Sequence, residues 1–159
     1  MPILILCFWL LAIFHATGCG GGTPTPPSSP TSPTPSNPGV LQVSGAYQIS
    51  QTALDDNCGM SSAPVTFMGT VAHTAGATTF TFTDTVGTRF SGTVERDGNF
   101  TATATQGPDS GGQTYNERLE GRFTATGFAA TLRVDVSPRN CRFTRSWTAA
   151  KQGAPNVVP

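Results

Sequence analysis

The chain contains few charged residues. Lys, Arg, Asp and Glu make up 11% of its 159 residues, and none of them precedes Asp55. Nine basic residues balance nine acidic residues, so the formal net charge is zero. Nucleic-acid binding usually requires an excess of Lys and Arg, because contacts with phosphates supply much of the affinity. The composition therefore predicts that nucleic acid is not a partner.

The chain also lacks the residue clusters that catalysis usually requires. It has only two histidines, His15 and His73, and no group of His, Cys and carboxylates with metal-ligand spacing. No nucleophile elbow is present. Asp55 and Asp56 are adjacent, which gives no indication of the separated pKa values that an acid and base pair needs. We therefore expect a protein that is not an enzyme and has no metal and no cofactor.

No apolar run is long enough to cross a membrane as a helix. The longest, residues 3–14, has 12 residues, whereas a span needs about 20. Its length is typical of a secretory signal peptide, so residues 1–18 are predicted to be cleaved. Residues 20–39 contain only Gly, Pro, Ser, Thr and Asn, with seven prolines. This composition predicts a disordered linker before a folded domain at 40–151, followed by a C-terminal tail at 152–159.

The end of the signal segment carries a short motif. Ala16-Thr17-Gly18-Cys19 resembles the lipobox of bacterial lipoproteins, in which small residues precede a Cys that is lipidated and becomes the mature N-terminus. The resemblance implies that residues 19–39 are a lipidated Cys19 plus linker. It also implies a membrane anchor in the cell envelope, at the outer membrane facing the periplasm or the cell surface. An ordinary secretory signal, in which Cys19 has no such role, is the alternative.

From Val40 onward the apolar residues recur with a period of two. In Thr88–Glu95, for example, Phe90, Gly92 and Val94 share one face and polar residues alternate with them. Tight turns such as Asp97-Gly98 favour hairpins between the segments. The pattern predicts eight strands, near Leu41–Ser50, Val65–His73, Thr78–Thr83, Thr88–Arg96, Asn99–Thr105, Thr114–Thr126, Phe128–Ser137 and Asn140–Ala149.

These strands predict an all-β domain, an eight-stranded antiparallel up-and-down barrel. Gly45, Gly69, Gly92 and Gly121 each lie between two inward apolar residues of a predicted strand. A glycine in the middle of a strand weakens it and is favoured where a sheet bends to close. A β-sandwich is the alternative, although it usually has longer crossover connections.

The cysteines give a second indication of closure. Cys7 lies in the signal segment and the lipobox resemblance assigns Cys19 to the lipid, so the domain holds only Cys58 and Cys141. An exported protein favours a disulfide between them. In a closed meander of eight strands the first and last are neighbours, and Cys58 follows the first while Cys141 begins the last. We predict a disulfide at this seam, with two free thiols as the alternative.

Two short segments resemble the calycin group of lipocalin and avidin-like barrels. Gly45-Ala46-Tyr47 stands in the first strand, where lipocalins have Gly-x-Trp, and Arg145 lies between Phe143 and Trp147 in the last. The resemblance implies that Arg145 packs across Tyr47 and plugs one end of the barrel.

The loops indicate which end of the barrel has a function. Connections 51–64 and 106–113 lie at one end and are long, whereas the end where the linker enters has short hairpins. Long loops on a rigid scaffold commonly carry binding sites. We expect a binding barrel for a small apolar ligand. The alternatives are an inhibitor-type barrel with a solid core that binds an envelope protein, or a passive structural role. The candidate ligand residues are Tyr47, Phe67, Phe90, Arg145 and Trp147.

Overall fold

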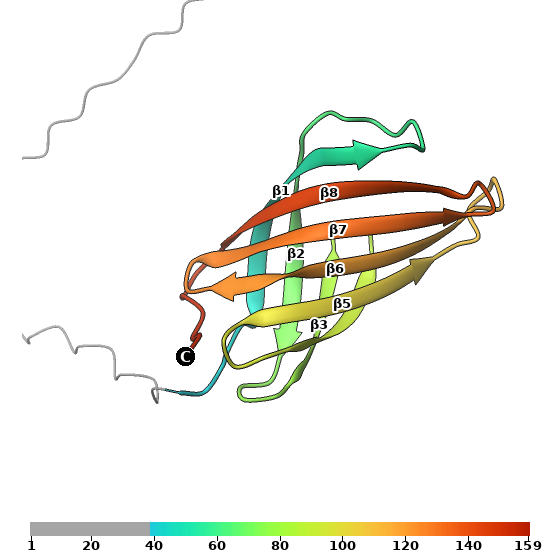
Figure 1. The fold of residues 1–159 in the computed structure, drawn as a ribbon. Coiled ribbons are helices and arrows are strands. Elements are labelled where there is room, and N and C mark those ends of the chain that lie inside the picture. The colour runs from blue at the N-terminus through green and yellow to red at the C-terminus, as the bar shows by residue number, and fades with distance from the viewer. Residues whose placement is uncertain (1–38) are drawn as a thin grey trace, which may run out of the picture. The chain divides into compact units, whose positions relative to one another are not determined.

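The computed structural model describes residues 39–159 as a closed antiparallel β-barrel (Figure 1). Consecutive strands pair along the chain, and β1 also pairs with β8. The predicted eight-stranded up-and-down barrel is confirmed, and the sandwich alternative is wrong. The predicted signal peptide, Cys19 and the linker as far as residue 38 lie outside the described residues. The strands are β1 (Gly45–Asp56), β2 (Val65–His73), β3 (Thr79–Asp84), β4 (Arg89–Val94), β5 (Asn99–Gln106), β6 (Thr114–Thr124), β7 (Gly127–Ser137) and β8 (Cys141–Lys151).

Alternation along each strand separates the core from the solvent. In β5, Phe100, Ala102 and Ala104 are buried and the threonines between them are exposed. Threonine suits these outward positions because β-branched side chains favour the extended backbone. The inner face is filled mainly by aromatic rings, whose centroids lie 4.7 Å apart for Phe100 and Phe123. The other buried rings are Tyr47, Phe80, Phe82, Phe90, Phe128 and Trp147.

One glycine on the inner face makes room for an aromatic ring. A Cβ added to Gly69 on β2 would lie 2.3 Å from the Phe82 ring, closer than side chains can approach. Gly69 therefore provides the space that Phe82 occupies. Close packing against the neighbouring strand therefore explains the glycine that the repeated pattern places at position 69.

The first strand is longer than predicted. β1 pairs with β2 over residues 45–51 and with β8 over residues 47–56, with a register shift between Ala53 and Asp55. We expected a loop from Gln51 onward, but four of the residues from 52 to 56 pair with β8 alone, and Leu54 lies at the register shift. Figure 1 shows the end of β1, in teal, leaving β2 and following β8. The extension lengthens the closing seam.

A lysine occupies the place that the calycin resemblance gave to Arg145. The β1–β8 register sets Tyr47 opposite Lys151, whereas Arg145 lies opposite Ala53 at the other end of the seam. Lys151 Nζ lies 4.9 Å from the Tyr47 ring centroid and donates to the Ser44 carbonyl. The packing of a cation across the first-strand aromatic is therefore present, but Lys151 provides it.

The C-terminal residues close the end of the barrel at which β1 begins. The Tyr47 hydroxyl lies 2.6 Å from the Val43 carbonyl oxygen and 2.7 Å from Asn156 Oδ1, and donates its one proton to either acceptor. Asn156 Nδ2 in turn donates to the Thr124 carbonyl oxygen over 2.8 Å. Burial raises the pKa of Tyr47 to about 12, although the bond to Asn156 acts in the opposite direction. Residues 156–158, expected as part of a tail, thus pack onto this end.

Cys58 and Cys141 form the predicted disulfide. Their Cα atoms lie 5.1 Å apart and their positions in the chain differ by 83 residues. The bond joins the loop after β1 to the first residue of β8, so it fastens the seam at the end opposite Tyr47.

The disulfide should contribute strongly to stability. In residues 20–159, which contain every strand of the barrel, reduction should lower the free energy of unfolding by up to about 4 to 5 kcal/mol, because the denatured chain regains the entropy of a long loop. Urea unfolding with and without reductant measures this difference. The double variant Cys58→Ser, Cys141→Ser is the control and should not respond to reductant. An unchanged midpoint for the reduced wild-type protein would contradict the prediction.

Candidate functional site

A pocket of about 300 Å³ opens at the end of the barrel that carries the long connections. This volume is at the lower end of the range for small-molecule sites. Every strand except β4 contributes to its lining, so the pocket is the mouth of the barrel. Its residues are Gln51, Val65, Phe67, Asp84, Thr85, Val86, Thr88, Gln106, Glu117, Leu132, Val134, Phe143 and Trp147.

Aromatic and aliphatic side chains form the floor of this mouth pocket. Trp147 is 3% exposed and meets Phe67 edge to face, with ring centroids 5.3 Å apart. The indole Nε1 of Trp147 donates to Gln51 Oε1 over 2.7 Å, which fixes the orientation of the ring. Leu132 and Val134 complete the floor from β7. A small apolar molecule placed here would contact side chains that are already held in position.

The structure separates the five predicted ligand residues. Phe67 and Trp147 line the mouth pocket. Phe90 is fully buried, with its ring centroid 6.0 Å from that of Trp147. Tyr47 is buried at the closed end, and Arg145 is bound in an ion pair near the start of β8. The barrel is therefore filled with side chains toward its closed end and is open at the mouth.

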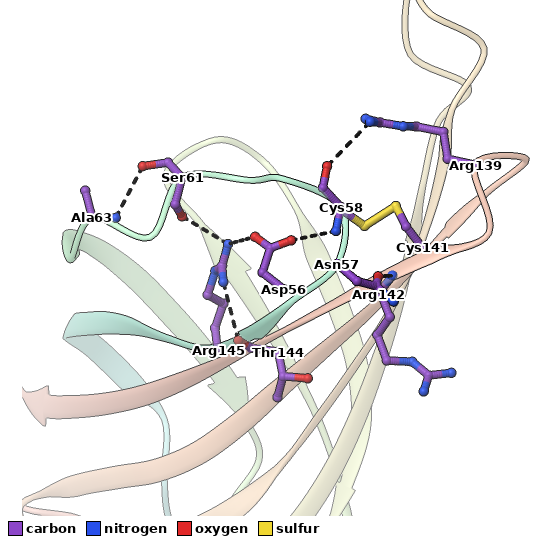
Figure 2. A network of polar contacts seen from close by, with 10 residues as sticks. All are labelled: Asp56, Asn57, Cys58, Ser61, Ala63, Arg139, Cys141, Arg142, Thr144 and Arg145. Carbon is purple, nitrogen blue, oxygen red and sulfur yellow. Dashed lines mark hydrogen bonds and ion pairs between the residues drawn. A yellow bond between two sulfur atoms is a disulfide. The ribbon is translucent and has the colours of Figure 1, made fainter.

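Arg145 fixes the loop after β1 (Figure 2). Its Nη2 lies 3.2 Å from Asp56 Oδ2 and donates to the Ser61 carbonyl oxygen over 3.1 Å. The Cys58 amide donates to the other oxygen of Asp56. Burial would raise the pKa of Asp56, but the bonds from Cys58 and Arg145 outweigh it and hold the pKa below its usual value. The ion pair and the disulfide thus hold residues 57–61 beside the mouth.

Sequence reasoning overlooked an acidic residue on the inner face. Glu117 precedes Leu119 and Phe123 at the same parity in β6, so the two-residue period alone places it inward. Gln106 Nε2 donates to its carboxylate. Burial, together with the nearby charge of Asp84, raises the pKa of Glu117 to about 6, against the lowering effect of Gln106. The pocket therefore combines an apolar floor with a carboxyl group that ionises at a higher pH than an ordinary glutamate.

Within residues 39–159, no three His, Cys, Asp or Glu residues lie close enough together to hold a metal ion, and no helix is long and apolar enough to cross a membrane. The His73 ring lies between the Val43 amide and the Ala77 carbonyl oxygen, which gives it a structural role. Comparisons of the chain with protein-family models, curated proteins and solved structures found no match.

Glu117 should make stability depend on pH. The unfolded chain ionises this carboxyl near the ordinary value of 4.5 and the folded chain near 6, so folding becomes less favourable as the pH rises between them. Glu117→Gln should therefore raise the free energy of unfolding above pH 6 by up to about 2 kcal/mol and change it little below pH 4.5. Urea unfolding of the wild-type protein and the variant, at one pH above 6 and one below 4.5, measures the effect.

Glu120→Gln is the matched control, because Glu120 lies on the outer face of β6 and pairs there with Arg118. If the two variants respond to pH in the same way, the half-buried carboxyl of Glu117 is not the cause.

Proposed function

We propose that this protein is a lipid-anchored binding protein of the cell envelope, whose barrel mouth holds a small apolar ligand. The observation that carries the proposal is the mouth pocket of about 300 Å³ over the Phe67 and Trp147 rings. An apolar molecule gains roughly 25 cal/mol for each Å² of surface that leaves water. A concave, preformed apolar site provides such burial without reorganisation.

Because one end of the barrel is filled with side chains, a ligand would enter only at the mouth. Tyr47, Asn156 and Lys151 fill that end, and the rings of Phe82 and Phe90 lie between it and the mouth. At the other end Val86, which lines the mouth pocket, is 85% exposed. Val86 therefore lies at the solvent-exposed rim of the pocket.

A calycin-like relationship agrees with this function. The closed eight-stranded meander and the packing of Lys151 over Tyr47 support it. We therefore propose that the domain is a calycin-like barrel, with Tyr47 in place of the lipocalin tryptophan and Lys151 as its cation.

Lipidation at Cys19 would leave the mouth accessible. The described chain begins at Gly39, beside the closed end, so the linker joins the barrel opposite the mouth pocket. The proline-rich segment 20–39 would have a reach of about 60 Å as an unbroken polyproline II helix. A barrel anchored in this way would present its mouth away from the membrane.

The uncharged alcohol 1-octanol tests the ligand proposal. Trp147 is the only tryptophan in residues 20–159, so its emission reports directly on the floor of the pocket. Octanol should change this emission saturably. Val134→Phe should weaken binding by about tenfold or more, because the added ring occupies space that the ligand needs.

Thr131→Phe adds the same ring to the outer face of β7 and should leave the affinity unchanged. Both variants are first checked for a cooperative thermal transition. If folded wild-type protein gives no saturable response, the ligand proposal is wrong and the protein-binding alternative is favoured.

The anchor proposal predicts that the protein leaves the membrane fraction when Cys19 is replaced. In the native host, Cys19→Ala should prevent lipid attachment and move the protein out of the membrane fraction, because the acyl chains provide the anchoring energy. Immunoblots of separated membrane and soluble fractions measure this, with Cys7→Ala as the control. A Cys19→Ala protein that stays with the membranes would overturn the proposal.

A further inference from the structure

The polar groups of the mouth pocket are acidic or neutral. Glu117 and Asp84 contribute carboxylates, Gln51 and Gln106 contribute amides, and no Lys or Arg is among the lining residues. A pocket with this polarity would repel a carboxylate or phosphate and attract a cation.

Glu117 is surrounded by weak partners. The register places it between Ala104 on β5 and Val134 on β7, both apolar. Among the other residues that line the pocket, Asp84 carries the one further charge. Arg145, buried on β8 between Phe143 and Trp147, does not line the pocket and is paired with Asp56. The remaining lining residues are uncharged: Gln51 on β1, Val65 and Phe67 on β2, Thr85, Val86 and Thr88 between β3 and β4, Gln106 on β5, Leu132 and Val134 on β7, and Phe143 and Trp147 on β8.

Three of the nine carboxylates in residues 39–159 pair with arginines, and Glu117 is not one of them. Asp56 pairs with Arg145, Asp135 with Arg142, and Glu120 with Arg118. Among the described residues the only side chain that hydrogen-bonds Glu117 is Gln106. Partial burial of a carboxylate without a cation carries a desolvation cost, and a cation brought by a ligand would offset it.

We propose that the mouth pocket takes a small ligand with an apolar body and a protonated primary amine, which donates a hydrogen bond to Glu117. This inference rests on the proposed function. The apolar body would lie on Trp147 and Phe67, and the amine would stand between the floor and the rim. Asp84 would add a second negative charge, without being the group that accepts the hydrogen bond.

Three eight-carbon probes separate this inference from the proposed function. Octylamine, 1-octanol and octanoate share the apolar chain and differ in the charge of the head group. At pH 7.5, octylamine should bind to residues 20–159 at least about tenfold more tightly than 1-octanol, because a charge-assisted hydrogen bond contributes more than a neutral one. Octanoate should bind more weakly than 1-octanol. Trp147 emission measures all three affinities.

Glu117→Gln should abolish the preference for octylamine while 1-octanol still binds. Glu120→Gln removes the same charge from the outer face of the same strand and should keep the preference. The octylamine affinity of the wild-type protein should also fall below pH 6, where Glu117 takes up its proton. In the Glu117→Gln variant this fall should be absent.

The two proposals fail in different ways. If none of the probes binds, the proposed function is wrong. If 1-octanol binds but octylamine binds no better, or if Glu117→Gln keeps the octylamine preference, the amine inference is wrong and the apolar pocket remains.

Discussion

Closure of the sheet between β1 and β8 is the constraint on which the rest of the structure depends. Residues 47–56 pair with β8, and without this seam the inner faces of the strands would not enclose a common interior. The seam is fastened at both ends by different chemistry. Lys151 packs over Tyr47 at one end, and the disulfide with the Arg145–Asp56 ion pair secures the other. Both a covalent bond and side-chain packing therefore resist opening.

Closure gives the barrel two unlike ends. Bulky rings and residues 156–158 fill one end, where the short hairpins lie. At the other end the inward positions pass from aromatic to polar, with Gln51, Asp84 and Glu117 above Trp147. A half-buried carboxylate with no cationic partner is expected to lower stability at neutral pH, and groups of this kind often mark functional sites. The physical cost of Glu117 is therefore an argument that it meets a ligand.

Much of the fold was predictable because it depends on a local period. Alternation, hairpin turns and the two domain cysteines were sufficient for the strand order, the closure and the disulfide. The length of β1 was not predictable, because its last residues are held by partners about ninety residues away in the chain. Phe67 and Trp147 were identified as pocket residues, whereas the place of Arg145 depended on a register that sequence alone does not give. Glu117 could have been found, since the alternation that places Leu119 inward also applies to it.

The most direct test of the account is to locate a bound apolar molecule by solution NMR. The indole N–H of Trp147 and the amides around Glu117 should shift when 1-octanol is added to ¹⁵N-labelled residues 20–159. The amides around Tyr47 at the closed end should not shift. Shifts confined to the outer face of the barrel, or no saturable shift at the mouth, would contradict the account.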